Sequence, residues 1–209
     1  MRNTLDFLIN VGKLKKMERR GWVLRGIKNP ETIAAHTFRM TLMAWVLCCK
    51  KKLSLNKILK MSLIHDLCEV CAGDTTPYDH MLPKDKKKWK PLFKNWRRLS
   101  KKEKERLFKN KHKKEKAGLN KLISGLPASL KGEIKDLWDD YEEGLSAEGR
   151  FVRQLDRIEN LLQALEYRKE GKKIFINPWW VQIEELIDDP LLIEFMRTLE
   201  SKFYKKGRK

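Results

Sequence analysis

The stretch LIHDLCEVCAGD, residues 63–74, gathers several side chains that bind metal ions or transfer protons. Its polar members are His65, Asp66, Glu69 and Asp74, and the residues around them are typical of a helix core. Imidazole nitrogens and carboxylate oxygens are ligands that divalent transition metals take from proteins. The stretch therefore predicts either a metal site or an ordinary helix end with a few polar residues.

Two residues elsewhere in the chain extend this set. His36 lies in the apolar segment ETIAAHTFRM, and Asp156 lies beside the apolar stripe of FVRQLDRIENLLQAL. A buried histidine needs partners for its ring nitrogens, and a buried carboxylate without a partner is costly. Taken singly, each histidine is explained as a hydrogen-bonded core residue and Asp156 as a surface residue. Together with His65 and Asp66, they predict a mixed nitrogen and oxygen ligand set with positions left open for water and substrate.

Glu69 and Asp74 follow the histidine at spacings that allow a catalytic role. On a continuous helix, His65 and Glu69 are four residues apart and share a face. Glu69 could then stand near the metal without ligating it, to orient water or give a proton to a departing oxygen. Asp74 comes directly after Gly73, which we expect to end the helix. The alternatives are a surface carboxylate for Glu69 and a turn or capping residue for Asp74.

Cys68 and Cys71 form a C-x-x-C pair inside the same stretch. A redox pair of the thioredoxin type follows a strand and opens a helix, whereas this pair lies in the body of an apolar segment. No second C-x-x-C completes a zinc site. We therefore predict that both cysteines pack as small apolar residues. The other two, Cys48 and Cys49, are adjacent, and the four together fit a reducing compartment.

The elements that must position these residues all have helical apolar spacing. No alternating strand pattern of useful length, internal repeat or glycine-rich phosphate loop is present. The chain is therefore predicted to be all-α. Ser54 and Ser100 are the expected N-caps of two helices. Helices are expected at residues 4–17, 31–49, 58–73, 100–126, 128–144, 146–171 and 181–200, the last interrupted at Pro190.

Length and composition limit the class of protein. The 209 residues, 41% of them hydrophobic, suit one domain with a real core. No apolar run reaches the roughly 18 residues that a membrane span needs. The N-terminal segment interrupts its apolar residues with charges and lacks a cleavage site of small residues, so it does not read as a signal peptide. We expect a cytoplasmic protein that does not enter a membrane.

The formal charge of +19 is concentrated in one segment. Residues 84–116 contain 17 Lys and Arg against 4 Asp and Glu, a net charge of +13. Aromatic residues are interleaved with these charges, which is one way to bind nucleic acid. The same pattern fits an amphipathic helix whose aromatic side chains face the core while its lysines are solvated. The segment could also attract anionic nucleotides or extend a dimer interface.

The motif made by His36, the pair His65-Asp66, and Asp156 resembles the signature of the HD-domain metal-dependent phosphohydrolases. The blocks RRGWVLRGIKNPETIAAHTFRM, LIHDLCEVCAGDTTPYD and FVRQLDRIENLLQALEY are similar to those of the 5′-deoxynucleotidase branch. The resemblance covers most of residues 14–167 and weakens in the basic segment and after Gly171. It implies a single helical HD domain over residues 1–209, with a lysine-rich helical insertion at about residues 80–120.

The resemblance also implies an activity and the residues for it. The activity is hydrolysis of nucleoside 5′-monophosphates, preferentially of deoxyribonucleotides, with a divalent cobalt, manganese or zinc ion, often by a homodimer. The implied metal ligands are His36, His65, Asp66 and Asp156. Glu69 and Asp74 match the carboxylates near the substrate and the nucleophile. Trp22 matches a residue of the sugar pocket, and Arg19 and Arg20 compete for the phosphate-binding role.

Two alternatives remain open at this level. One is an HD phosphohydrolase that acts on nucleoside triphosphates, cyclic nucleotides or phosphodiesters. The other is a helical protein without catalytic activity that binds nucleic acid through its basic insertion and keeps the metal for stability. Related folds do not share a substrate by necessity, so the base and the sugar preference stay undetermined.

Overall fold

The computed structural model of the chain describes residues 1–49, 51–76, 79–85, 89 and 99–204. Within these residues the only pairing of extended backbone is an isolated antiparallel bridge between Glu18 and Thr32, so the all-α prediction is confirmed. None of the described helices combines the length and the apolar character that crossing a membrane requires.

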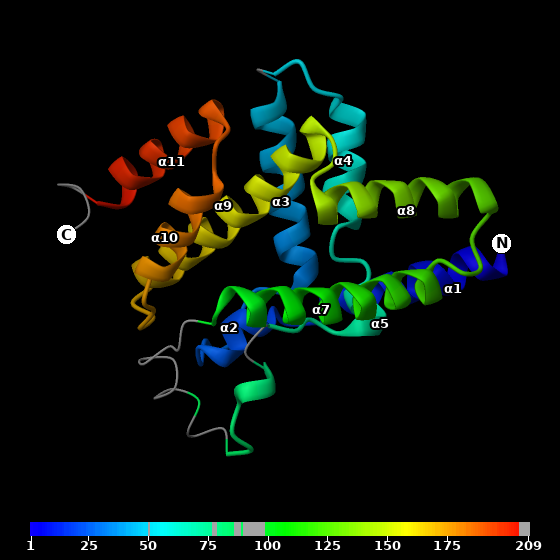
Figure 1. Cartoon of the computed structure of the whole chain (residues 1–209), viewed down its shortest axis with the longest axis horizontal. Coiled ribbons are helices and arrows are strands. Elements are labelled where there is room, and N and C mark those ends of the chain that lie inside the picture. Colours follow the sequence, from blue (N-terminus) through cyan, green and yellow to red (C-terminus); the bar gives the residue numbers. More distant parts are fainter. Residues whose placement is uncertain (50, 77–78, 86–88, 90–98, 205–209) are drawn as a thin grey trace. The chain divides into compact units, whose positions relative to one another are not determined.

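The helices follow the chain in the order drawn in Figure 1. The first part contains α1 (Arg2–Val11), the 3₁₀ helix η1 (Gly12–Lys15), α2 (Arg20–Leu24), α3 (Ile33–Cys48), α4 (Leu55–Ile64), α5 (Glu69–Ala72) and η2 (Asp79–Met81). The second part contains α7 (Lys101–Leu122), α8 (Ala128–Glu143), α9 (Ala147–Lys169), α10 (Asn177–Leu186) and α11 (Pro190–Phe203).

The chain divides into two compact units, each built from two separate stretches of sequence. The first unit comprises Met1–His36 and His65–Lys135, and the second comprises Thr37–Ile64 and Asp136–Lys209. Neither unit is a continuous sequence segment. The single domain predicted for residues 1–209 stays a prediction.

In the first unit, α7 packs closely against the short helix α5 (Figure 1). The packing depends on Gly118, because a Cβ atom there would lie 2.9 Å from the carbonyl oxygen of Cys68 and 3.1 Å from the backbone nitrogen of Ala72. Contacts this short leave no room for a side chain. Ser100 caps α7 as predicted, and its capping box is completed by Glu103.

In the second unit, α9 packs against α4, α10 and α11 (Figure 1). The apolar stripe predicted for this helix is buried, including Phe151, Val152, Leu155 and Ile158. Ser146 caps α9 by accepting a hydrogen bond from the backbone of Gly149, which has no side chain to complete a capping box. The sequence pattern of this helix therefore predicted its position in the core correctly.

Two details of the predicted helices were wrong. The helix expected over residues 58–73 ends at Ile64, and a turn over residues 65–68 separates it from α5. No helix was expected between residues 17 and 31, but the short helix α2 lies there. The interruption expected at Pro190 is confirmed, because α10 ends at Leu186 and Asp189 caps a new helix that begins at Pro190.

Candidate metal centre

The turn over residues 65–68 and the first turn of α3 present the histidines of the motif. His36 lies one turn into α3, where its backbone N–H donates to the carbonyl oxygen of Thr32. His65 and Asp66 follow the last residue of α4 and have side chains that point out of the turn toward His36. The break in the predicted helix thus falls at the residues for which chemistry was expected.

The structure brings His36, His65 and Asp66 together within the first unit. The Nε2 atoms of the two imidazoles lie 3.2 Å apart. The Oδ2 atom of Asp66 lies 3.1 Å from Nε2 of His65 and 3.9 Å from Nε2 of His36. Both histidines are at most 2% exposed, so water does not account for this convergence of polar atoms.

These separations fit a shared metal ion. An imidazole nitrogen binds zinc at about 2.0–2.1 Å, so two ligand atoms on one ion lie roughly 3 Å apart. The distances of 3.2 Å and 3.1 Å match that expectation, and two nitrogens with one carboxylate are a typical ligand set for a divalent transition metal. The alternative of two separately satisfied core histidines does not explain why both Nε2 atoms face one carboxylate.

The two candidate arginines have different partners. Arg19 Nη1 donates to Oδ2 of Asp66 at 2.7 Å, at the carboxylate that faces both histidines. Arg20 Nε donates to Oδ1 of Asp79 at 2.7 Å, and its guanidinium lies 5.1 Å from the ring centre of Trp89. Only Arg19 has its guanidinium at the metal centre, whereas that of Arg20 is bound to the segment that follows α5.

The local backbone explains why Arg19 reaches this position. The backbone N–H of Arg19 donates to the carbonyl oxygen of Glu31, and that of Ile33 donates to the carbonyl oxygen of Met17. These bonds join the segment before α2 to the segment before α3. Arg19 is therefore fixed beside the first turn of α3, which carries His36.

Burial and the neighbouring charges have different net effects on the pKa values of Asp66 and Glu69. Burial alone raises the pKa of Asp66, but the charges of His65 and Arg19 hold it well below its usual value. Burial, together with the charges of Asp66 and Asp74, raises the pKa of Glu69 well above its usual value. Asp66 is therefore ionised at neutral pH, whereas Glu69 is much more readily protonated.

Glu69 is the least satisfied of these carboxylates. It is 2% exposed, and its Oε2 atom has no hydrogen-bond partner within the described part of the chain. The prediction of a shared helix face with His65 was wrong because the helix breaks between them, although Glu69 still begins the next helix. The alternative of a surface carboxylate for Glu69 is also wrong.

Asp74 and Trp22 are held by specific contacts. Gly73 ends α5 with a positive φ of 75°, as predicted, and the Oδ2 atom of Asp74 accepts a hydrogen bond from the backbone of Arg20 at 2.7 Å. Trp22 is 2% exposed, and its indole Nε1 donates to Oε1 of Glu31 at 2.8 Å. Asp74 thus lies close to the arginine segment, and Trp22 is a core residue with a single fixed orientation.

Asp156 belongs to the second unit, on α9. It is 5% exposed, so the alternative of a surface residue is wrong. Tyr141 donates to its Oδ2 atom at 3.3 Å and Asn160 donates to its Oδ1 atom at 3.0 Å. Its role as the fourth metal ligand stays a prediction.

The cysteines are all free. Cys68 is buried as predicted, and burial raises the pKa of its thiol, which makes it a poor nucleophile. Cys71 is exposed, so the prediction that it packs in the core was wrong. The short helix α5 explains the difference, because one of its sides faces α7 and the other faces away from it.

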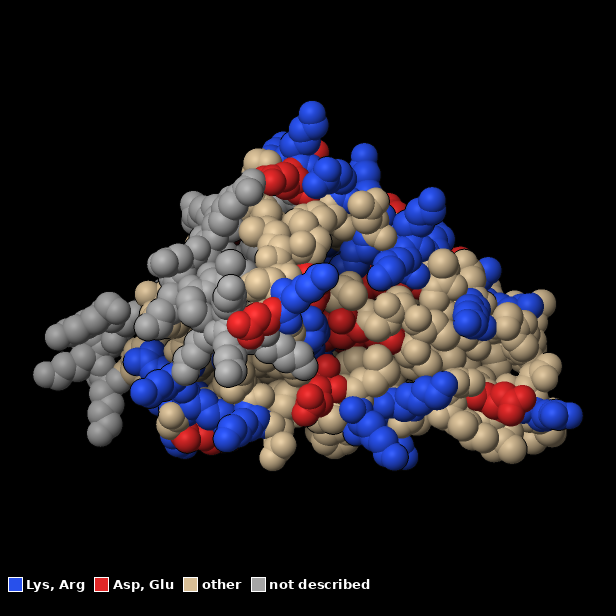
Figure 2. Space-filling model, turned by 90° about the horizontal axis from the view of Figure 1, so that it is seen from below, with Lys and Arg blue, Asp and Glu red and all other residues tan. Residues whose placement is uncertain are grey.

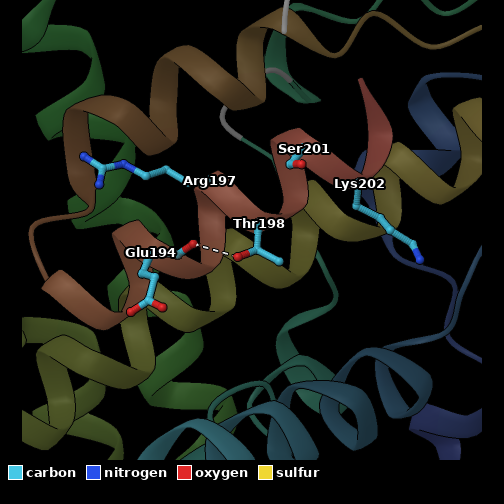
Figure 3. Close-up of a pocket in the computed structure, with 5 residues that line it drawn as sticks. All are labelled: Glu194, Arg197, Thr198, Ser201 and Lys202. Carbon is cyan, nitrogen blue, oxygen red and sulfur yellow. Dashed lines mark hydrogen bonds between the residues drawn. The ribbon is translucent and has the colours of Figure 1, made fainter. Parts of the chain in front are cut away.

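A shallow pocket lies on the surface of α11 in the second unit (Figure 3). All five of its lining side chains come from this one helix, and the hydroxyl of Thr198 donates back to the carbonyl oxygen of Glu194 at 3.0 Å. It contains no histidine and no buried charge. It therefore offers no chemistry comparable to that of the histidine cluster.

The basic insertion is described only in part. Residues 86–88 and 90–98, including Phe93 and Trp96, lie outside the described residues. On α7 most lysines are exposed, as predicted for a solvated face, but Phe108 is 50% exposed and does not face the core. In Figure 2 the basic side chains are interrupted by acidic and uncharged ones on the face that is drawn.

Sequence reasoning missed two charged residues near this centre. Lys111 and Glu115 on α7 were read as part of the general basic segment, but Glu115 is 4% exposed and its Oε1 atom lies 2.8 Å from Nζ of Lys111. The available signal was the spacing of Lys111, Glu115, Gly118 and Leu122, which repeats one helix face. An acid and a glycine on that face distinguish it from the lysine-rich remainder.

Known proteins with similar sequences and folds agree with the motif. A family model described as HD domain matches residues 11–187. The 5′-deoxynucleotidase HDDC2 of Xenopus laevis is 36% identical over 172 residues, which are 82% of this chain and 73% of that protein. The protein of the same name from Homo sapiens is 31% identical over 201 residues, which are 96% of this chain and 86% of that protein.

A solved structure supports the fold. A conserved hypothetical protein from Pyrococcus furiosus superimposes with a TM-score of 0.66 at 25% identity, covering 93% of this chain and 97% of its own. The family match spans most of the chain and includes the first three motif residues in the arrangement described above. By its sequence match, its helical fold and its histidine–aspartate cluster, the chain belongs to the HD domain family.

Proposed function

We propose that this protein is a metal-dependent phosphohydrolase that removes phosphate from nucleoside 5′-monophosphates, with preference for deoxyribonucleotides. The observation that carries the proposal is the convergence of His36, His65 and Asp66 within 3.9 Å, with Arg19 bound to the same carboxylate. The names of the relatives, 5′-deoxynucleotidases, support the substrate class.

The proposed metal ligands are those of the family motif. His36, His65 and Asp66 supply two nitrogens and one carboxylate oxygen, and Asp156 supplies the fourth ligand by its place in the motif. A divalent cobalt, manganese or zinc ion held by these residues would supply Lewis-acid chemistry at the phosphate and would lower the pKa of water near it. The native metal among these three is a matter for metal analysis.

Arg19 is the proposed phosphate-binding arginine. Its guanidinium is at the metal centre, and an arginine there stabilises the negative charge that develops on the phosphate in the transition state. Arg20 is proposed to hold the substrate side of the site in place, because it binds Asp79 through its side chain and Asp74 through its backbone. These contacts support Arg19 over Arg20 in the choice that the sequence left open.

Glu69 and Asp74 are the proposed acid–base residues. Glu69 is buried, and one of its oxygens accepts no hydrogen bond from the described residues, so it can accept a proton from water or give one to the departing 5′ oxygen. Asp74 is held by the backbone of Arg20 and would orient the nucleophile or the substrate. Trp22, fixed by Glu31, is proposed to form a wall of the sugar pocket, where a rigid indole would disfavour the additional ribose hydroxyl.

Metal analysis combined with a phosphate-release screen tests the proposal. The purified protein should contain a divalent transition metal, and removal with a chelator should stop phosphate release from deoxynucleoside monophosphates until the metal is returned. His65→Ala should lose both metal and activity. Faster release from di- or triphosphates, cyclic nucleotides or phosphodiesters would support the other kind of HD phosphohydrolase, and equal activity without metal would refute both.

We also propose that two copies of the chain associate. Four apolar residues of α3 lie on one exposed face of the second unit, at spacings of four, three and one residues. They are Phe38, Leu42, Trp45 and Val46, each at least 41% exposed. Burial of such a stripe is favourable, and the resemblance implies a homodimer. Light scattering should give twice the 24.9 kDa mass of the chain, and Phe38→Glu should give the single mass.

Nucleic acid binding by the insertion is the second candidate function. The observation that favours it is Phe108, which is 50% exposed among the exposed lysines of α7 and stacks on His112 at 6.1 Å between ring centres. Binding of RNA that weakens steeply with salt and depends on Phe108 would support it. The cytoplasmic location expected from the sequence stays a prediction.

A further inference from the structure

One face of α7 differs from the rest of this basic helix. Lys111, Glu115, Gly118 and Leu122 repeat at the spacing of a single helix face, and all but Lys111 are buried. Gly118 brings this face into direct contact with the backbone of α5, which begins at Glu69. Lys111 therefore extends from the side of α7 that packs on the carboxylate site.

Lys111 is held by a buried partner and yet keeps access to solvent. Its Nζ atom lies 2.8 Å from Oε1 of Glu115, and the side chain of Lys111 is 38% exposed while that of Glu115 is 5% exposed. A buried carboxylate is stable only with a charged or hydrogen-bonded partner. Glu115 thus fixes the position of the ammonium group, and the exposed part of Lys111 leaves room for an anion.

The charge of Lys111 acts on the candidate site. Burial alone lowers the pKa of Lys111, but Glu115, Glu69 and Asp66 together raise it above its usual value, so the amine is charged at neutral pH. Lys111 in turn lowers the pKa of Glu69 and Asp74 against the larger effect of burial, which raises both. These influences add to the helix packing as evidence that the ammonium lies near the carboxylates.

Lys111 supplies positive charge to a neighbourhood that is rich in carboxylates. Four carboxylates of the first unit belong to this neighbourhood, namely Asp66, Glu69, Asp74 and Glu115, and their cationic neighbours are Arg19 and Lys111. Loss of Lys111 leaves this acidic set with one more uncompensated negative charge. Such an excess repels a phosphate dianion.

We propose that Lys111, positioned by Glu115, binds the phosphate of the nucleotide as a second cation beside Arg19. This inference rests on the proposed phosphohydrolase function. It assigns a role in the substrate site to one residue of the basic insertion, while the other lysines of α7 remain a solvated face. Lysine provides a point charge for such a contact, without the two-pronged geometry of arginine.

The test compares substitutions on two opposite faces of α7. The double variant Lys111→Met/Glu115→Gln removes the ion pair without leaving a buried charge, so it is expected to fold. Lys113→Met removes the same charge from the opposite, exposed face of the helix and serves as the matched control. Each metal-loaded protein is titrated with inorganic phosphate by calorimetry, and KM and kcat are measured for a deoxynucleoside monophosphate.

The double variant should raise the dissociation constant of phosphate and the KM by about tenfold or more, because a charged hydrogen bond is lost. Its metal content should stay close to that of the wild type, and Lys111→Arg alone should keep most of the phosphate affinity. Wild-type phosphate affinity in the double variant would overturn the inference, as would an equal loss in Lys113→Met. A wild-type protein that binds phosphate through Lys111 but releases none from nucleotides would refute the proposed function alone.

Discussion

Two charged clusters, one in each unit, show how differently this chain buries charge. In the second unit, Arg39 donates to Glu159 at 2.8 Å and to Gln163 at 2.7 Å, and it also pairs with Glu166. We call this set the arginine cluster. In the first unit, Asp66, Glu69, Asp74 and Glu115 form an acidic cluster, and its cationic neighbours among the described residues include Arg19 and Lys111.

The two clusters differ in whether their buried carboxylates have charged or hydrogen-bonded partners. Glu159 is fully buried, but it is paired with a guanidinium that joins α3 to α9, so the arginine cluster is complete without a ligand. Glu69 is almost as buried, yet its Oε2 atom has no hydrogen-bond partner among the described residues. A buried carboxylate without a partner reduces stability, and such groups concentrate at functional sites.

Glu69→Gln should have the largest effect on activity. It keeps the shape of the side chain but removes the group proposed to transfer a proton, so kcat should fall by about 10²–10³-fold. Because an unsatisfied buried carboxylate is removed, the melting temperature should stay equal or rise. Kinetics and thermal unfolding of the same preparation check both parts. A melting temperature several degrees lower would mean that Glu69 stabilises the fold, as Glu159 does.

Arg39→Met should have the largest effect on stability. It leaves Glu159 buried without its charged partner, and breaking a buried pair in this way costs about 3 kcal/mol. Urea unfolding measures the loss. The double variant Arg39→Met/Glu159→Gln should recover more than half of it, because the uncompensated charge is then gone. If the double variant is no more stable than the single one, the arginine cluster does not act through charge pairing.

Gly118→Ala should disturb the contact that brings α7 to the acidic cluster. The added Cβ atom would meet the backbone of Cys68 and Ala72, so we expect a loss of about 1–3 kcal/mol in the free energy of unfolding. Gly132 in α8 is the control, since a Cβ atom there meets nothing within 4 Å. Gly132→Ala should gain about 0.5–1 kcal/mol from helix propensity. Equal effects of the two substitutions would contradict the close packing.

The smallest expected effect concerns Asp140 of the second unit and its dependence on pH. Burial alone raises the pKa of Asp140, but hydrogen bonds from Lys57 and Ser146 outweigh it and hold the pKa below its usual value. Stability from a lowered pKa is complete above about pH 3.9, the pKa of an unfolded aspartate, and is lost as the pH falls through the folded value.

Asp140→Asn should therefore cost about 1 kcal/mol at pH 7, in line with the loss of one charge-assisted hydrogen bond. The difference from the wild type should shrink as the pH falls below about 4, because the wild-type aspartate is then protonated as well. Urea unfolding at several pH values measures it. A difference that grows in acid would mean that Asp140 is stabilised in its protonated form instead.

The fold class and the identity of most candidate residues followed from local patterns. The helical periodicity predicted α3, α8 and α9 closely, and each of them has a buried apolar side, although α3 also exposes the apolar face that begins at Phe38. The turn after Ile64 was missed because apolar residues at helical spacing continue across residues 58–73, and periodicity alone does not reveal a break between helical segments. The burial of Cys68 was predicted, but the exposure of Cys71 was not.

By itself, the sequence determined that the protein is helical and that two histidines and an adjacent aspartate are candidates for one metal site. Only the tertiary structure showed that Arg19 reaches Asp66 while Arg20 reaches Asp79, since adjacent residues with the same chemistry differ in what their side chains contact. It also showed that Lys111 pairs with a buried glutamate on the helix face that Gly118 brings against α5. Spacing along the chain fixes which face a residue shares, but the partner of that face is set by packing between distant segments.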